Sequence, residues 1–319
     1  MKRIISSFLF FAIVCCGFAQ AQQQQQDTIV VARDGTGKYR TIAEAVESVR
    51  AFMHYTVTIY IKNGLYKEKL IIPSWIKNVQ LVGESAEGTI ITYDDHANIN
   101  KMGTFRTYTV KVEGSEITFK DLTIENNAAQ LGQAVALHTE GDKLKFINCR
   151  FLGNQDTIFT GSEGSRLLFT NCYIEGTTDF IFGPSTVLFE NCVIHSKRNS
   201  YITAASTPEK IEFGYVFKNC KLTAAPGVNK VYLGRPWRPH AATAFLNCEM
   251  GEHIVPVGWH NWGNAENEKT ARYSEYDSKG PGANPKARVG WSKQLTDKEV
   301  RNYTIENIFK DCSNWYPYK

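Results

Sequence analysis

Two aspartates occupy the same position in two consecutive copies of an internal repeat. The segments FINCRFLGNQDTIF (146–159) and FTNCYIEGTTDFIF (169–182) align without a gap and place Asp156 and Asp179 23 residues apart. A short repeat of this kind indicates a solenoid in which each copy forms one coil stacked on the last. Because strands paired between adjacent coils lie about 4.8 Å apart, we expect the two carboxyl groups to be neighbours.

Two acidic groups at that separation cannot both ionise freely. One is pushed toward the neutral acid while the other stays an anion, so one residue type supplies a proton donor and a nucleophile or base. Gln155 precedes Asp156, and Gln133 lies 23 residues before Asp156, so we expect Gln133 to join the same column. Two amide donors beside two carboxylates suit a reaction that builds a negative oxygen on a tetrahedral carbon. Acyl transfer fits this set best.

The repeat continues beyond these two copies and predicts the architecture that holds the aspartates. Phe-x-Asn-Cys recurs at 189–194, 217–222 and 245–250, with a degenerate earlier copy, FKDLTI, at 119–124. Each unit has the pattern of a short strand that buries Phe, Cys and Ile or Leu on one face, with a turn-prone Asn just before the Cys. Stacked copies predict an all-β fold, a right-handed parallel β-helix, with loops of varying length on the outside of the coils.

Two capping boxes predict helices that close the ends of this solenoid. Thr41-Ile42-Ala43-Glu44 begins a pattern whose apolar helical face would contain Ile42, Ala45, Val46, Val49 and Phe52. Thr296-Asp297-Lys298-Glu299 repeats the capping pattern before Val300, Tyr303 and Ile308. The segment 251–288 is rich in Gly, Pro, Asn and Trp, and we expect it to form long loops along the outside of the coils.

The N-terminal residues predict export. Residues 1–21 contain Lys2 and Arg3, an apolar run that ends at Cys16, and an Ala-Gln-Ala cleavage site, which together are typical of a secretory signal peptide. We therefore expect a secreted or periplasmic protein; a surface lipoprotein, suggested by the Cys-Cys-Gly at 15–17, is the less favoured alternative. Residues 22–28 are interpreted as a polar Gln-rich spacer and 29–319 as one β-helix catalytic domain. No later stretch approaches the ~20 apolar residues that a membrane span needs.

Charge and cysteine content limit the partners and cofactors. The net charge of +4 falls to +2 once Lys2 and Arg3 are removed, which argues against nucleic acid as a partner. No Cys-x-x-Cys occurs and the histidines show no ligand spacing, so no metal site is expected. Five of the eight cysteines share one repeat position, where they should pack as small apolar side chains. In an oxidising compartment Cys172 and Cys192 are the preferred disulfide pair.

Six motifs, in one order along the chain, resemble the pectin methylesterase family of β-helical carbohydrate esterases. They are DGTGKYRTI (34–42), GLY (64–66), GQAVAL (132–137), GNQDT (153–157), DFIFG (179–183) and LGRPW (233–237). The resemblance implies that Asp179 is the nucleophile that attacks the methyl ester of a galacturonate unit. It implies that Asp156 is the acid that protonates the departing methanol and later the base that activates water.

The same resemblance implies roles for further residues. Gln133 and Gln155 match the family's oxyanion-hole glutamines, and Arg235 matches an arginine that would hold Asp179 ionised by a charge-assisted hydrogen bond. The expected substrate-binding residues are Trp237, which matches a subsite aromatic, together with Thr104, Phe180 and Tyr201. The implied partner is methyl-esterified homogalacturonan, no metal or organic cofactor is implied, and the chain is expected to act as a monomer.

Two other functions stay open at this point. β-Helices also host pectate and pectin lyases, which would give an unsaturated, ultraviolet-absorbing product and often use an acidic calcium-binding cluster that is not evident in this sequence. A non-catalytic polysaccharide-binding solenoid is the alternative from another class. It requires a column residue unsuited to chemistry, and all of the expected residues are present. A serine hydrolase is not favoured because no G-x-S-x-G motif occurs.

Overall fold

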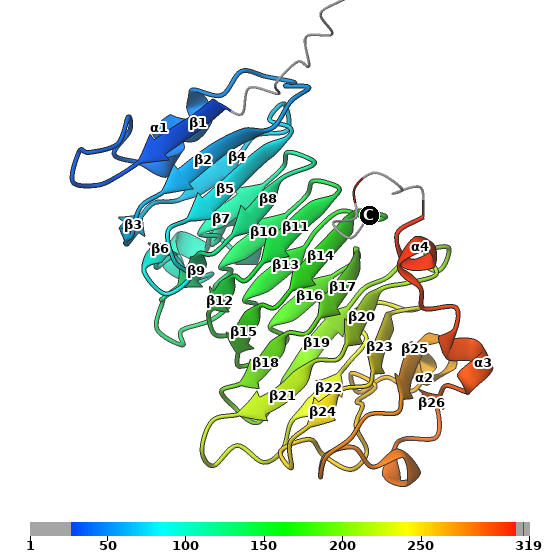
Figure 1. Ribbon diagram of the computed structural model, residues 1–319. Helices are drawn as coiled ribbons and strands as arrows, with labels where there is room; N and C mark the ends of the chain where they lie inside the picture. Colours follow the sequence, from blue (N-terminus) through cyan, green and yellow to red (C-terminus); the bar gives the residue numbers. More distant parts are fainter. Residues whose placement is uncertain (1–26, 311–314, 316–319) are drawn as a thin grey trace, which may run out of the picture.

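The computed structural model describes residues 27–310 and Trp315 and shows a parallel β-helix, which confirms the predicted fold class (Figure 1). The 11-stranded sheet contains β1 (Asp27–Val31), β2 (Val57–Ile61), β5 (Val79–Gly83), β8 (Thr118–Lys120), β11 (Leu144–Ile147), β14 (Arg166–Thr170), β17 (Thr186–Glu190), β20 (Tyr215–Lys218), β23 (Ala242–Leu246), β25 (Arg272–Tyr276) and β26 (Lys293–Gln294). The 8-stranded sheet contains β3 (Gly64–Lys67), β6 (Thr89–Tyr93), β9 (Thr123–Asn126), β12 (Arg150–Leu152), β15 (Tyr173–Gly176), β18 (Val193–Ser196), β21 (Lys221–Ala224) and β24 (Glu249–Met250). The 7-stranded sheet contains β4 (Leu70–Ile72), β7 (Val110–Val112), β10 (Leu137–Thr139), β13 (Ile158–Thr160), β16 (Ile181–Gly183), β19 (Tyr201–Ala205) and β22 (Tyr232–Gly234). Each coil of the middle region contributes one strand to each sheet.

The asparagine before each repeat cysteine forms the corner between the 11-stranded and 8-stranded sheets. All five asparagines adopt left-handed backbone conformations, with φ of 52° at Asn148, 55° at Asn171, Asn191 and Asn219, and 54° at Asn247. Asparagine tolerates this region better than most residues because its short polar side chain can bond locally. The turn predicted from the repeat is therefore confirmed.

Stacked phenylalanines from successive coils form the centre of the core. Phe119, Phe146, Phe169, Phe189, Phe217 and Phe245 are fully buried. Their ring centroids follow one another at 5.2, 4.5, 4.9, 4.5 and 4.4 Å. Buried aromatic side chains remove large apolar areas from water, and truncating one to alanine typically costs about 3–5 kcal/mol. The stack fixes the coils in register.

The five repeat cysteines form a second interior column, and the predicted disulfide is wrong. All five are buried free thiols, including Cys172 and Cys192. Each of these two directs Sγ at a carbonyl of the preceding coil, Cys172 at Phe146 O (3.3 Å) and Cys192 at Phe169 O (3.5 Å). Side chains that point the same way along a column cannot form an S–S bond of about 2.05 Å without turning toward each other.

Helix α1 (Ile42–Glu47) lies at the N-terminal end of the coils, as predicted. The capping box between Thr41 and Glu44 is present, and Ile42, Ala45 and Val46 are buried in the core cluster. The expected burial of Phe52 is wrong, because the helix ends earlier. Phe52 has a left-handed φ of 55°, donates its N–H to Trp75 O (2.9 Å) and is 69% exposed.

The second predicted capping helix does not close an end of the solenoid. Its capping box is present, but it starts the short α3 (Asp297–Val300), and a separate α4 (Ile305–Ile308) follows. Both lie beside the 11-stranded sheet (Figure 1). The apolar cluster there contains Leu188, Val216 and Ile308. The outer face of this sheet carries apolar side chains that need cover, so the C-terminal helices pack on its flank.

The segment 251–288 is only partly loop. It contains α2 (Glu266–Thr270), the strand β25 and the short 3₁₀ helix η3 (Pro285–Ala287). Trp259 is 1% exposed and stacks on Tyr273 at 4.3 Å, inside the core rather than outside the coils. The nearly buried ion pair between Arg288 and Glu275 (2.8 Å) fastens the following turn to β25. The prediction of external loops is therefore wrong for this part.

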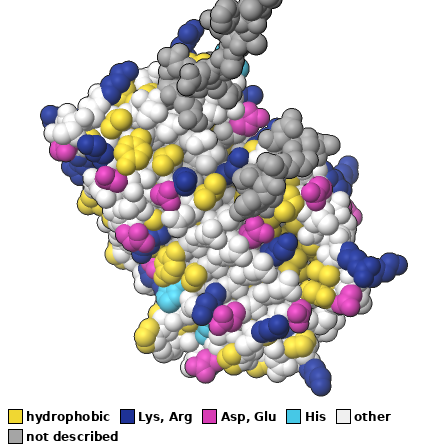
Figure 2. All heavy atoms as spheres, viewed as in Figure 1, with side chains coloured by type: hydrophobic (Ala, Val, Ile, Leu, Met, Phe, Trp, Pro, Cys, Tyr) yellow, Lys and Arg dark blue, Asp and Glu magenta, His cyan; other side chains and the backbone are white. Residues whose placement is uncertain are grey.

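The predicted signal peptide (1–21) lies outside the described residues. Strand β1 begins at Asp27, so the last two residues of the predicted spacer (22–28) belong to the first strand. In the part of the chain that is described, no helix is long and apolar enough to cross a membrane. On the face in Figure 2, basic and acidic side chains are interspersed, in keeping with the small net charge.

Candidate active site

Asp156 and Asp179 lie at the same turn of neighbouring coils. Each stands two residues before a strand of the 7-stranded sheet, Asp156 before β13 and Asp179 before β16. Ile158 pairs with Ile181, and the N–H of Asp156 donates to Thr178 O at 3.1 Å. The 23-residue spacing is therefore the length of one coil, and the prediction that these two residues are neighbours is confirmed.

Both aspartates have left-handed backbones and are buried. Their φ values are 66° at Asp156 and 48° at Asp179, and their exposed fractions are 9% and 6%. Non-glycine residues rarely adopt this conformation outside turns, although Asp tolerates it better than most. Such strain persists only where the surroundings enforce it, and it is concentrated at functional sites.

Arg235 bonds one of the two carboxylates. It follows β22, two coils beyond Asp179, and donates Nε–H to Asp179 Oδ1 (3.0 Å) and Nη2–H to Oδ2 (2.6 Å). A bidentate guanidinium–carboxylate pair favours the ionised acid. Burial raises the pKa of Asp179 above its ordinary value, and the hydrogen bonds and charge of Arg235 act in the opposite direction.

Asp156 has a different environment. Burial and, second, the charge of Asp179 raise the pKa of Asp156 well above its ordinary range, and the more distant Arg235 opposes this only in part. Among residues 27–310 and 315, no side chain or backbone group hydrogen-bonds the Asp156 carboxyl. The pair can therefore hold one proton on Asp156 while Asp179 remains the anion.

The two glutamines lie beside each other, and the predicted single column is wrong for Gln133. Strand β10 pairs with β13 through Leu137 and Ile158, 21 residues apart rather than 23. The N–H of Ala134 donates to Gln155 O (3.0 Å), so the chain at Gln133 runs beside Gln155 and not in the aspartate column. The change of spacing ahead of β10 is a local irregularity in the ladder of the kind that a bulge produces. Both glutamine side chains are partly exposed.

The three predicted groove aromatics lie in different surroundings, and one of them is buried. Phe180 is fully buried in the core cluster, so its prediction as a substrate-binding residue is wrong. It directly precedes β16, and within that strand Ile181 lies in the same core cluster while Phe182 lies on the opposite face, because successive residues of a strand point to opposite faces. Tyr201 begins β19 and places its ring 3.9 Å from the guanidinium carbon of Arg235. Trp237 meets the edge of Phe182, with ring centroids at 5.8 Å.

A family model described as Pectinesterase matches residues 28–312. The chain belongs to the pectinesterase family. Pectinesterase 31 of Arabidopsis thaliana is 39% identical over 292 residues, which cover 88% of this chain and 91% of that protein. A pectinesterase/pectinesterase inhibitor of Brassica campestris is 37% identical over 304 residues, which cover 90% of this chain and 53% of the relative, so the chain spans about half of that relative's length.

Solved pectin methylesterases share the fold. The carrot enzyme has a TM-score of 0.84 and 32% identity, covering 88% of this chain and 92% of its own. A pectin methylesterase in complex with a hexasaccharide has a TM-score of 0.77 and 31% identity, covering 89% of this chain and 97% of its own. Unrelated proteins that share only a fold usually have lower sequence identity than these two matches, so both agree with the family assignment.

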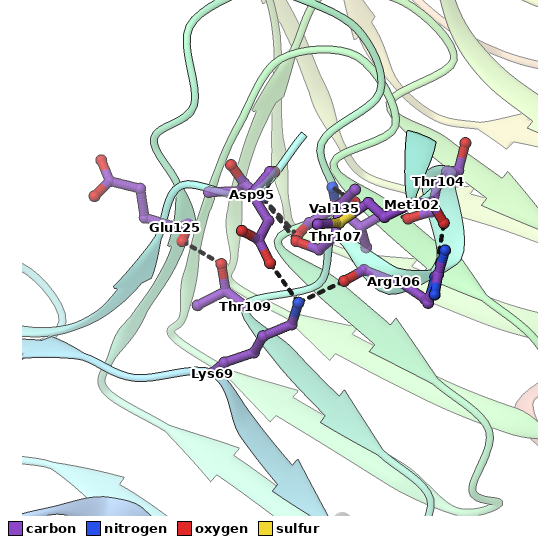
Figure 3. Close-up of polar contacts among 10 residues, drawn as sticks. Lys69, Asp95, Met102, Thr104, Arg106, Thr107, Thr109, Glu125 and Val135 are labelled. Carbon is purple, nitrogen blue, oxygen red and sulfur yellow. Dashed lines mark hydrogen bonds and ion pairs between the residues drawn. The ribbon is translucent and has the colours of Figure 1, made fainter. Parts of the chain in front are cut away.

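Thr104 lies in a long turn in which the nearby Thr107 hydroxyl accepts the N–H of Val135 at 2.9 Å (Figure 3). This turn contains the 3₁₀ helices η1 (Ile99–Lys101) and η2 (Thr104–Arg106). The ammonium group of Lys69 binds both the carboxylate of Asp95 and the carbonyl of Arg106, and so fastens both ends of the turn (Figure 3). A contact of Thr104 with sugar stays a prediction. Its neighbour Phe105 packs on Phe159 at 4.8 Å.

An aromatic row on the outer face of the 7-stranded sheet was missed by the sequence analysis. Phe159 and Phe182 pair across β13 and β16 with centroids at 4.8 Å, and Phe105 and Trp237 extend the row at its two ends. A signal for it existed, because Phe159 and Phe182 each lie three residues after an aspartate of the repeat. Phe159 and Phe182 are 8% and 4% exposed, so the row is a buried apolar cluster that packs on the outer side of this sheet.

His138 packs beside Phe105 and Phe159 at one end of this row. It is 4% exposed, packs against Phe159 at 4.8 Å, and places Nε2 2.7 Å from Glu140 Oε1. His138 and Glu140 form a pair, and within residues 27–310 and 315 no group of three or more His, Cys, Asp or Glu side chains has the arrangement of a metal site.

Proposed function

We propose that this protein is an esterase that removes methyl esters from the galacturonate units of pectin and releases methanol. The observation that carries the proposal is the buried carboxyl pair in which, among the described residues, a cation bonds Asp179 and none bonds Asp156. Membership of the pectinesterase family supports the substrate class. A polymeric cell-wall substrate also agrees with the predicted export of the chain.

In the first half of the reaction, the Asp179 carboxylate attacks the ester carbonyl carbon. The amide N–H groups of Gln133 and Gln155 donate to the oxyanion of the resulting tetrahedral intermediate. Collapse of this intermediate breaks the bond to the methoxy oxygen, and Asp156 gives its proton to that oxygen, so methanol leaves. The product is an acyl-enzyme in which Asp179 and the galacturonate carboxyl form an anhydride.

In the second half, Asp156, now a carboxylate, takes a proton from water. The water oxygen attacks the galacturonyl carbon, the bond to Asp179 breaks, and the free galacturonate carboxyl is released. Asp156 is protonated again and Asp179 is ionised again, so the cycle closes with one water consumed for each methanol formed. Arg235 favours the ionised form of Asp179 at both ends of the cycle.

The test is methanol release from highly esterified pectin by Asp179→Ala. We expect a loss of at least about 10⁴-fold, as for removal of a catalytic nucleophile in other hydrolases. Asp121→Ala is a matched control, because Asp121 has a similar left-handed φ of 53° at a corner remote from the pair. That variant bears the same backbone cost and should turn over substrate as the unaltered protein does. Ordinary turnover by folded Asp179→Ala, or an ultraviolet-absorbing product, which a lyase would give, contradicts the proposal.

A further inference from the structure

The guanidinium of Arg235 lies between two aromatic rings. Its central carbon is 3.9 Å from the ring centroid of Tyr201 and 3.7 Å from that of Trp262. Its N–H edge meanwhile bonds both oxygens of Asp179. Aromatic faces attract a cation electrostatically at this distance. A planar guanidinium stacked between two rings must lie parallel to them, so its N–H edge is free to point at Asp179.

Core packing does not explain the conformation of Trp262. The residue is 38% exposed and has a left-handed φ of 62°, which is a genuine outlier for a bulky side chain. The turn is enforced locally, because the N–H of Trp262 donates to His260 Nδ1 (3.0 Å) and that of Gly263 donates to Asn261 Oδ1 (2.8 Å). A strained backbone that directs an exposed ring onto one particular cation points to a role at the site.

We propose that Trp262 is a positioning residue that holds the guanidinium of Arg235 in its bidentate geometry against Asp179. This inference deepens the proposed function and rests on it. Tyr201 supplies the other face from β19, where Tyr232 stacks behind it at 5.2 Å. The Tyr201 carbonyl also accepts the N–H of Asp179 (2.9 Å), so a change at Tyr201 disturbs the aspartate directly. Trp262 contacts Arg235 through its ring alone, so a change at Trp262 tests the stacking contact without disturbing the backbone bond to Asp179.

Few other titratable groups face the Arg235–Asp179 pair. Asp156 lies in the preceding coil, and burial together with Asp179 raises its pKa. His260 packs against Tyr201 at 5.3 Å, and burial, followed by the charge of Arg235, lowers its pKa, which keeps the ring neutral at neutral pH. Tyr273 lies in the core, where burial raises its pKa well above the ordinary value. Arg235 is therefore the cation that decides the ionisation of Asp179.

The sign of the expected effect follows from this arrangement. Arg235 lowers the pKa of Asp179 against the effect of burial, so a loosened guanidinium lets that pKa rise. The acid limb of the kcat/KM profile then moves to higher pH, because the free protein must ionise Asp179 before attack. Removing the whole indole would also admit water, which favours the ionised carboxylate and so lowers the pKa of Asp179. Trp262→Leu keeps an apolar cover but has no aromatic face, and Trp262→Phe keeps both.

The experiment compares Trp262→Leu with Trp262→Phe in the full chain. We expect Trp262→Leu to lower kcat by about 3- to 30-fold, the range of a partly to fully desolvated cation–π contact, with KM changed less than about twofold. Its acid limb should move to higher pH, and Trp262→Phe should restore most of both. Trp237→Leu is the contrast, because the rings that cover the Arg235 guanidinium are those of Tyr201 and Trp262 and not that of Trp237. It should raise KM and leave the acid limb in place.

A second measurement does not depend on the reaction. Carbon-13 NMR titration of the Asp179 carboxyl in substrate-free protein, assigned with Asp179→Asn, should show a higher pKa in Trp262→Leu than in Trp262→Phe. An unchanged titration overturns the inference, as does a rise in KM alone, which indicates sugar contact, or a fall in Tm alone, which indicates a structural role. If Asp179→Ala remains active while the titration shifts, the proposed function fails and the positioning role stands.

Discussion

The turns Gln155-Asp156-Thr157 and Thr178-Asp179-Phe180 are one local structure used twice with different neighbours. Both aspartates have left-handed φ, both are less than a tenth exposed, and their coils pair in register. The differences lie outside the aspartates themselves. Asp179 is bonded by Arg235 from two coils away, whereas no cation of residues 27–310 bonds Asp156. The repeat thus places two aspartates in equivalent backbone positions. The residues around each aspartate then give the two carboxyl groups different tendencies to ionise.

The flanking residues extend this contrast. Thr157 is buried and donates its hydroxyl to the carbonyls of Asn154 (3.1 Å) and Glu175 (3.0 Å), so it fixes its turn by hydrogen bonds. The equivalent Phe180 fixes the next turn by burying a ring in the core. The first turn is therefore held by polar bonds and the second by apolar packing.

The largest effect that sharpens the comparison is expected from Asp156→Asn. Asparagine keeps the size and tolerates the left-handed turn but cannot transfer the proton, so kcat should fall about 10²- to 10⁴-fold. Release of the alcohol from esters with better leaving groups, compared with release of methanol from the methyl ester, checks this, because a leaving group that needs no proton should recover part of the rate of the first half. Equal losses on all esters would show that Asp156 is not the acid.

A smaller effect is expected when the first turn is made like the second. Gln155→Thr copies Thr178 and removes one of the two proposed oxyanion donors, so kcat should fall about 10²-fold, near the lower limit for such a donor. KM for pectin should change little, because the lost bond strengthens only as the oxyanion forms. Steady-state kinetics at several pectin concentrations measure the split, and a change confined to KM would contradict the assignment.

The smallest effect is one on stability, with the opposite sign. The folded-state pKa of Asp156 is raised by burial and by Asp179. A carboxyl group with a raised folded pKa costs stability as pH rises above its unfolded pKa, and the cost is complete above the folded pKa. Asp156→Asn should therefore raise Tm at neutral pH by about 2–4 °C for each kcal/mol recovered, and should have no such effect at pH 3. Thermal unfolding at both pH values provides the check.

Features that recur in every coil could be predicted from the sequence, and local departures from the repeat could not. The left-handed corners at Asn148 and Asn171 and the pairing of Asp156 with Asp179 follow from a spacing that is the same in neighbouring coils. Gln133 was misplaced because the coil before it changes length locally, and the position of an irregularity in a ladder is decided by tertiary contacts.

Side-chain direction and long-range contacts were the other gaps. Phe180 was assigned to the groove although it directly follows an outward-facing aspartate, where a residue of the opposite orientation is expected. The aromatic faces on Arg235 were not predicted, because Trp262 comes from a loop whose path no periodicity describes. In the same way, Trp259 and Tyr273 entered the core through a strand that the Gly- and Pro-rich composition of 251–288 concealed.

The position of Arg235 along the stack ties the proposed active site to the C-terminal coils. It follows β22, the last strand of the 7-stranded sheet, whereas the strands after Asp156 and Asp179 lie at the middle of that sheet. Beyond β22 the pairing continues only through the isolated bridges Val231–Ile254 and Gly234–Trp259 among the described residues. Because each coil of a solenoid is stabilised by its neighbours, we expect this sparsely paired region to open before the middle of the sheet. Such local opening would withdraw the guanidinium while both aspartates stay in place, so mild heating should lower activity reversibly while most coils are still folded.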